Sequence, residues 1–172
     1  MLFRSVAFVA YLAALVVFAG AAVFGVVRGR GVAGSLSMQG MLGTLLQLGA
    51  AVTITRVMSA GRLLPQTWEL VGMLLAPLSA WLFVCAQVPA TRATGELVTD
   101  GAYAWVRHPM YLAFLGLLLA TGCAVSAGWM LLLAVALYVA GTELRISVEE
   151  AGLAGYSEYR RRTRWAYLPG LR

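Results

Sequence analysis

Long apolar runs separated by isolated charged residues dominate the chain and predict helices that cross a membrane. Three intervals before position 92 contain no charged residue: 5–27, 31–55 and 70–91. At about 1.5 Å per residue, each is long enough to span the roughly 30 Å hydrocarbon core of a bilayer as a helix. The first interval is also longer than the apolar core of a signal peptide, which has about 7 to 15 residues, so we expect a retained helix.

The fourth uncharged interval, 109–142, is too long for one transmembrane helix, since it would extend for about 51 Å. Small residues between positions 121 and 128, including two glycines, permit a turn there. The sequence therefore predicts an all-α polytopic membrane protein, a single domain over 1–172, with five transmembrane helices. The last two would form a helical hairpin whose first member is short.

Composition and charge agree with a membrane protein and give it an orientation. Apolar residues make up 61% of the chain and charged residues 12%, whereas charged residues approach a quarter of a soluble domain. All 13 basic residues are arginines, and the five-span topology places most of them on one side. The arginines on that side are Arg28, Arg30, Arg92, Arg107, Arg145, Arg160, Arg161, Arg162, Arg164 and Arg172. This side should face the cytoplasm, with the N-terminus outside and the C-terminus inside, in the inner or plasma membrane of a bacterium.

The C-terminal arginines predict a tail that rests on anionic lipid headgroups, and nucleic acid is not an expected partner. Two other patterns carry no chemistry in this interpretation. The hexapeptide 29–34 matches the glycine pattern of dinucleotide-binding loops, but it joins two predicted membrane helices instead of following a strand. Cys85 and Cys123 lie in apolar runs without ligand spacing, so neither a disulfide nor a metal site is expected.

A first polar segment precedes the fourth predicted span and combines aromatic, basic and helix-start signals. Pro109 suits the first position of a helix and favours an extended His108 before it. Unpaired backbone amides at this helix start, beside Arg107 and His108, predict an anion pocket at the membrane edge. The alternative is an interfacial anchor, in which Tyr103 and Trp105 lie among the lipid headgroups.

A second polar segment follows the last predicted span. Arg145 and Glu149 are four residues apart and share one face of a helix, while Glu150 points about 100° away. The simpler alternative is a solvated helix end with one surface ion pair, worth under about 1 kcal/mol. However, four of the seven acidic residues lie between positions 143 and 158, on the side that carries the arginines. We therefore expect the two polar segments to close over a polar ligand.

Taken together, these residues resemble a known family. The run Arg107-His108-Pro109-Met110-Tyr111, then Arg145 with the Glu149-Glu150 pair and a later Tyr-x-x-Tyr, is similar to the isoprenylcysteine carboxyl methyltransferase and phospholipid methyltransferase family. The resemblance covers about 97–172, which would be the catalytic half of the domain. It implies an integral membrane enzyme that moves a methyl group from S-adenosylmethionine to a lipid-like acceptor on the cytoplasmic side, with S-adenosylhomocysteine as product.

The resemblance also implies roles for individual residues. Those expected to line the cofactor site are Arg107, His108, Tyr111, and Glu149 or Glu150, with Arg145 near the acceptor. Aromatic rings such as Tyr103, Trp105 or Tyr111 could face the positive sulfur of the cofactor. As catalytic residues we expect Arg145, which would orient a carboxylate acceptor, and His108, which would serve as the base for an amine.

The acceptor stays open at this point. Methylation of an isoprenylcysteine carboxylate is favoured, and a phospholipid amine or another small acceptor is the alternative. Two interpretations from other classes remain: an NADPH-dependent membrane reductase, since sterol reductases carry a similar Arg-His-Pro segment, and a membrane scaffold or small transporter without enzymatic activity. Oligomeric state is not predicted.

Overall fold

The computed structural model describes residues 37–60, 66–92, 97–124, 129–153 and 155–168, together with the single positions 9, 13 and 16. Apart from these three positions, the predicted span 5–27 lies outside the described residues. The glycine-rich hexapeptide 29–34 also lies outside them.

Within the described part, the all-α class is confirmed. The α-helices are α3 (Met38–Ala60), α4 (Gln66–Arg92), α5 (Pro109–Ala124), α6 (Trp129–Gly152) and α7 (Tyr156–Arg162), and a short 3-10 helix, η1, covers Gly101–Ala104. None of the described segments forms a strand, and the one backbone bridge among them pairs Val106 with Trp165 in parallel.

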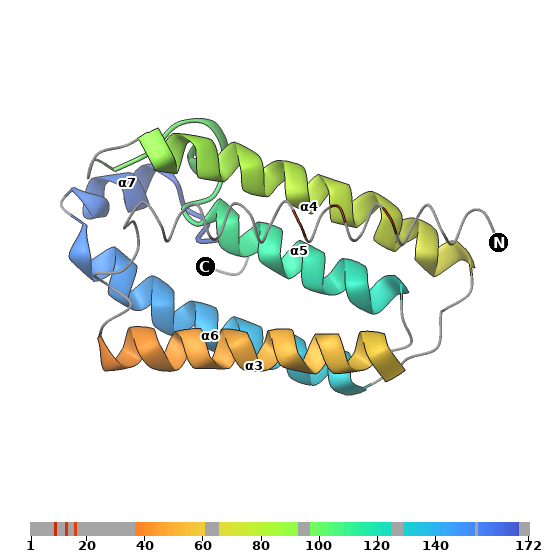
Figure 1. Ribbon diagram of the computed structural model, residues 1–172. Coiled ribbons are helices and arrows are strands. Elements are labelled where there is room, and N and C mark those ends of the chain that lie inside the picture. The colour runs from red at the N-terminus through yellow and green to blue at the C-terminus, as the bar shows by residue number, and fades with distance from the viewer. Residues whose placement is uncertain are drawn as a thin grey trace.

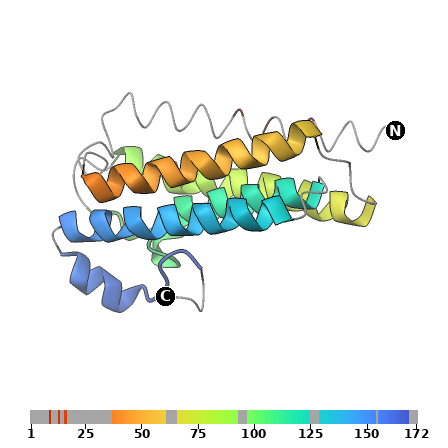
Figure 2. The same ribbon diagram turned by 90° about the horizontal axis from the view of Figure 1, so that it is seen from below.

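The four long helices pack as two pairs that differ from the predicted hairpin. Helix α3 lies along α6, and α4 lies along α5 (Figure 1). The turned view shows the same pairing, with α7 and the C-terminal segment at one end of the bundle (Figure 2). Helices α5 and α6 follow each other in sequence but contact each other much less. The hairpin of the last two spans is therefore not confirmed as a packing unit.

Small residues explain why these pairs form. Gly43 of α3 and Gly141 of α6 face each other so closely that a Cβ atom on Gly43 would lie 2.7 Å from the carbonyl oxygen of Gly141. In the other pair, Gly116 of α5 packs directly on Ser79 of α4. Side chains without bulk let helix backbones approach, which is how helices associate when lipid supplies no hydrophobic contrast.

Helix α6 is the one described helix that is long and apolar enough to cross a membrane, by length and composition. Shorter apolar stretches cover Met38–Ile54, Leu74–Ala90 and Pro109–Cys123. Large apolar side chains are exposed on these helices, such as Leu45, Leu74, Trp81 and Leu132. The number of five transmembrane helices stays a prediction, although this exposed apolar surface is what lipid would cover.

The apolar part of α6 ends at Thr142, and the charged residues of the helix follow it between Glu143 and Gly152. Helix α5 begins at the same end of the bundle, where α7 and the last described residues also lie (Figures 1 and 2). One end of an otherwise apolar bundle therefore collects the polar residues of three helices.

Candidate active site

The first polar segment folds as the sequence predicts. Pro109 is the first residue of α5, and the carbonyl oxygen of His108 accepts hydrogen bonds from the backbone N–H groups of Tyr111 (3.1 Å) and Leu112 (3.4 Å). Proline suits this position because its missing N–H would have no partner inside the helix. The start of α5 thereby fixes the backbone from which His108 and Tyr111 project.

The chain returns to this point in a C-terminal strap, residues 163–168. The backbone N–H of Arg107 donates to the carbonyl of Trp165 (2.9 Å), and that of His108 donates to Ala166 (2.7 Å). Tyr167 is 1% exposed, and its hydroxyl donates to Glu143 of α6 (2.9 Å). The strap carbonyls therefore take up the backbone donors of Arg107 and His108, while the anion pocket expected from the amides at the start of α5 stays a prediction.

His108 joins the two polar segments. Its Nδ1 lies 3.6 Å from a carboxylate oxygen of Glu149, and its Nε2 lies 3.3 Å from Oε1 of Glu150. The side chains of His108 and Glu150 are 9% and 10% exposed, whereas that of Glu149 is 32% exposed. Two segments about 40 residues apart in sequence thus meet, with Glu149 on the more accessible side.

Arg107 is enclosed by the protein. Its side chain is 1% exposed, its Nε donates to the hydroxyl of Tyr156 (3.1 Å), and its Nη1 donates to the carbonyls of Thr163 (2.8 Å) and Arg164 (2.6 Å). It also lies 3.5 Å from Glu150. These contacts bind the C-terminal strap to the start of α5, so they leave little of the guanidinium for a ligand.

Tyr156 of α7 is a member of this cluster to which sequence reasoning gave no role. Its hydroxyl donates to Glu150 (2.9 Å) and lies 3.1 Å from Nε2 of His108. The Tyr-x-x-Tyr spacing was the available signal, since it puts Tyr156 and Tyr159 on neighbouring positions of one helix face. We call the connected set the polar cluster: Arg107, His108, Tyr111, Arg145, Glu149, Glu150 and Tyr156.

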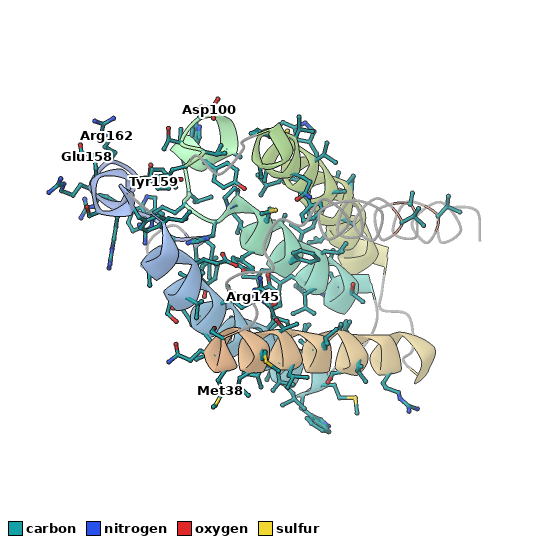
Figure 3. All side chains as sticks on the ribbon, turned by 60° about the vertical axis from the view of Figure 1, so that its left-hand side comes forward. Met38, Asp100, Arg145, Glu158, Tyr159 and Arg162 are labelled. Atoms are coloured by element: carbon teal, nitrogen blue, oxygen red, sulfur yellow. The ribbon has the colours of Figure 1, made fainter. Side chains whose placement is uncertain are left out.

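The more accessible half of the polar cluster centres on Arg145. Its Nε donates to the hydroxyl of Tyr111 (2.9 Å) and its Nη2 to Glu149 (3.2 Å), while the Tyr111 hydroxyl itself donates to Glu149 (2.6 Å). Nη1 donates to the hydroxyl of Thr44 in α3 (2.8 Å). Figure 3 shows Arg145 on the side of α6 that faces the interior of the bundle. Arg145 and Glu149 share one helix face, as predicted. The contact between Arg145 and α3 was not predicted from the sequence.

Tyr103 is the predicted site residue that the structure leaves apart. Its ring is buried with Tyr156 and Tyr159, and its backbone carbonyl accepts from the Tyr159 hydroxyl (2.6 Å). Among the described residues, its own hydroxyl has no bond to the polar cluster. Trp105, the other aromatic residue of this segment, is 81% exposed, so no enclosed site surrounds its ring.

A surface groove of about 360 Å³ lies beside α7, apart from the polar cluster. Its lining residues are Leu97, Thr99, Ala104, Gly155, Glu158, Tyr159, Arg162 and Thr163. In Figure 3, Glu158 and Arg162 point away from the bundle. No residue of the polar cluster lines this groove. We therefore take the polar cluster, and not the groove, as the candidate site for a polar ligand.

Hydrogen bonds set the charge state of the polar cluster beyond the apolar part of α6. Burial alone would raise the pKa of Glu150, but hydrogen bonds from His108 and Tyr156 and the charge of Arg107 lower it to about 2. Burial and the neighbouring Glu150 raise the pKa of Tyr156. Glu150 is therefore a carboxylate and Tyr156 a neutral donor at neutral pH. No group of three or more His, Cys, Asp or Glu among the described residues could hold a metal ion.

The fold and the polar cluster define a helical protein whose charged residues from distant segments gather at one end of an apolar bundle. Residues 86–155 match the model of the isoprenylcysteine carboxyl methyltransferase (ICMT) family. The resemblance inferred from residues 107–111 and 145–150 is confirmed over this segment, which begins in α4 and ends before Tyr156. The family is one of methyltransferases, which supports an enzymatic function. No curated protein and no solved structure matches the chain.

Proposed function

We propose that the protein transfers a methyl group from S-adenosylmethionine to the carboxylate of a lipid-like acceptor, of the isoprenylcysteine kind. The observation that carries this proposal is the approach of His108 to both Glu149 and Glu150, within a segment that matches the methyltransferase family. An apolar bundle that ends in a charged cluster suits a reaction between a water-soluble donor and an acceptor with an apolar tail.

The chemistry of the polar cluster fits the cofactor. When bound, S-adenosylmethionine supplies a methyl group activated by the positive sulfur that carries it. Glu149, the more exposed of the two carboxylates, would accept hydrogen bonds from the amino group or the ribose hydroxyls. A carboxylate placed directly against the sulfur would stabilise the reactant more than the transition state, because the positive charge disappears during transfer. His108 and Tyr111 would form the wall of the cofactor site.

Three residues would support this site without contacting the cofactor themselves: Glu150, Arg107 and Tyr156. Glu150 accepts from the hydroxyl of Tyr156 and lies beside His108 and Arg107. A side chain held by several partners loses less freedom when a ligand binds, which favours affinity. In this proposal, Glu150 and Tyr156 fix the orientation of His108.

The surroundings of His108 support a carboxylate acceptor over an amine. A protonated amine must lose a proton before it attacks, and His108 is the only histidine in the chain. Both of its ring nitrogens already lie beside carboxylate oxygens, at 3.6 Å and 3.3 Å, so an amine would have to reach them past Glu149 or Glu150. A carboxylate needs no base, because it is already ionised at neutral pH.

The proposed membrane placement puts the polar cluster at the cytoplasmic surface. Arg160, Arg161, Arg162 and Arg164 are exposed beside it, and Arg164 lies over the ring of Trp165 at 5.9 Å. Basic and aromatic side chains beyond the end of an apolar helix are typical of a cytoplasmic headgroup region. The acceptor would then enter from the bilayer with its carboxylate directed toward the surface.

Two measurements on the purified full-length protein test this function. The first is transfer of a radiolabelled methyl group from S-adenosylmethionine to total membrane lipid and to a prenylated cysteine. The second is calorimetric binding of S-adenosylmethionine in detergent. We expect Glu149→Gln to weaken binding at least tenfold, because a carboxylate that accepts from a charged group is lost.

Glu158→Gln is the matched control, since Glu158 is an exposed carboxylate whose ion pairs, among the described residues, are with Arg161 and Arg162 on α7. It should leave binding unchanged. Equal affinity of wild type and Glu149→Gln would remove Glu149 from the cofactor site. Thermal stabilisation by NADPH, without any by S-adenosylmethionine, would instead favour a reductase.

A further inference from the structure

Helix α3 lies outside the segment that matches the family, yet it reaches the polar cluster. Gly43 of α3 and Gly141 of α6 allow the two backbones to touch, and a Cβ atom on Gly43 would also lie 2.8 Å from Cγ of Arg145. One residue after Gly43, the hydroxyl of Thr44 accepts a hydrogen bond of 2.8 Å from Nη1 of Arg145. The glycine contact therefore brings Thr44 within reach of a side chain 101 positions away in sequence.

The hydrogen bonds of Arg145 leave part of its guanidinium available. A guanidinium has five N–H donors. One on Nε donates to Tyr111, one on Nη2 to Glu149 and one on Nη1 to Thr44. Among the described residues, nothing accepts from the remaining N–H of Nη1 or of Nη2. Two donors on adjacent nitrogens match the two oxygens of a carboxylate.

Thr44 fixes the direction of these two donors. Without it, Nε and Nη2 would still be held by Tyr111 and Glu149, but Nη1 would lose its only anchor among the described residues. Thr44 is itself held, because its hydroxyl donates to the carbonyl of Gly40 in the preceding turn (2.9 Å). A hydroxyl that donates to its own helix can accept from the neighbouring helix in a fixed direction.

We propose that Thr44 is a positioning residue, which orients the guanidinium of Arg145 so that its two remaining N–H groups bind the carboxylate of the acceptor. This inference rests on the proposed function for the identity of the acceptor. It assigns to α3 a part in recognising the acceptor that the matched segment alone does not contain. Thr44 acts through Arg145 and contacts no reacting atom.

The chain offers a matched control in the same helix. Thr53 makes the same bond to its own helix as Thr44 does, from its hydroxyl to the carbonyl of Gly49 (2.8 Å), but it has no bond to Arg145. Thr44→Val and Thr53→Val therefore remove the same group from the same kind of helical position. Valine keeps the branched shape, and Thr44→Ser restores the hydroxyl.

The experiment compares binding of a prenylated cysteine with a free carboxylate and of its methyl ester, by calorimetry of the full chain in detergent. We expect the wild type to bind the acid more tightly than the ester, since only the acid offers two anionic oxygens. Thr44→Val should reduce this preference about tenfold, which is the size expected for one charge-assisted hydrogen bond. Thr44→Ser and Thr53→Val should keep it.

Methyl transfer measured in parallel separates this inference from the proposed function. Thr44→Val should raise KM for the acceptor and leave the affinity for S-adenosylmethionine unchanged, a split that general loss of structure would not give. Equal preference for the acid in Thr44→Val and Thr53→Val would overturn the inference. A wild type that prefers the acid through Thr44 but transfers no methyl group would overturn the proposed function alone.

Discussion

The apolar middle of the bundle and its polar end are built from the same helices but are specified in different ways. In the middle, α4 and α5 contact each other through residues such as Phe83 and Phe114, whose rings pack edge to face with their centroids 5.1 Å apart. Many apolar side chains of similar volume could fill such positions. At the polar end, Glu150 has three neighbours that each need a charged or hydrogen-bonding partner. Substitutions should therefore be tolerated in the middle and costly at the end.

The largest effect is expected from Glu150→Ala. It removes the carboxylate beside Arg107, whose side chain is 1% exposed, and leaves that charge without its anionic partner. Breaking a buried ion pair in this way destabilises by about 3 kcal/mol. Thermal unfolding in detergent should show a clear fall in melting temperature for Glu150→Ala. The fall should be smaller for Glu150→Gln, because the glutamine amide keeps a carbonyl oxygen that can accept hydrogen bonds. A wild-type melting temperature for Glu150→Ala would contradict the contrast between the two regions.

A pair of glycine substitutions tests the contact between α3 and α6, which reaches the polar end of the bundle at Gly43. Gly43→Ala places a Cβ atom 2.7 Å from the backbone of Gly141, which cannot move aside as a side chain can, and should destabilise by about 2 kcal/mol. Gly49→Ala, on the same helix, meets only the side chain of Leu137 at 3.7 Å. The higher helix propensity of alanine should then stabilise by about 0.5 kcal/mol. Unfolding measurements that rank the two variants in reverse order would rule out the α3–α6 contact.

The two tyrosines of α7 separate the role of the polar cluster from that of packing. Tyr156→Phe removes the hydroxyl that donates to Glu150 (2.9 Å), whereas Tyr159→Phe removes one that donates to the backbone of Tyr103 (2.6 Å). Each variant should lower stability by about 1 kcal/mol. Only Tyr156→Phe should also weaken S-adenosylmethionine binding, because Tyr156 donates to Glu150 and Tyr159 does not. Similar calorimetric affinities in both variants would place Tyr156 outside the support of the site.

The smallest effect concerns pH. The pKa of Glu150 is lowered to about 2 from an ordinary value of 4.5 in the folded protein, so its stabilisation is present above about pH 4.5 and is lost as the pH falls toward 2. Between pH 7 and pH 4 the loss is less than about 1 kcal/mol. Melting temperatures measured over this range should fall more in the wild type than in Glu150→Gln. Parallel curves would show that Glu150 is not held as a carboxylate by its neighbours.

The sequence predicted the polar end better than the way the helices pair. The start of α5 at Pro109 and the shared face of Arg145 and Glu149 follow from local rules, so they could be inferred from spacing alone. The pairing of α3 with α6 could not, because helices that are apolar on most sides have no period that marks the packed face. Gly43 and Gly141 mark that face, but many other glycines in the chain look the same in sequence.

The C-terminal strap escaped prediction for another reason. Its bonds to Arg107 and His108 come from backbone carbonyls of residues 163–166, and every residue has such a carbonyl. Sequence gives no sign of which of them will accept a bond. The same limit applies to Thr44, because its hydroxyl reaches Arg145 only where α3 packs against α6.

The most direct test is a structure of the full-length protein with S-adenosylhomocysteine, the product of the proposed reaction. We predict that the ligand contacts His108, Tyr111 and Glu149, residues from both polar segments. A ligand seated instead in the groove between Thr99 and Arg162, with no contact to Glu149, would contradict the proposal that the polar cluster is the cofactor site.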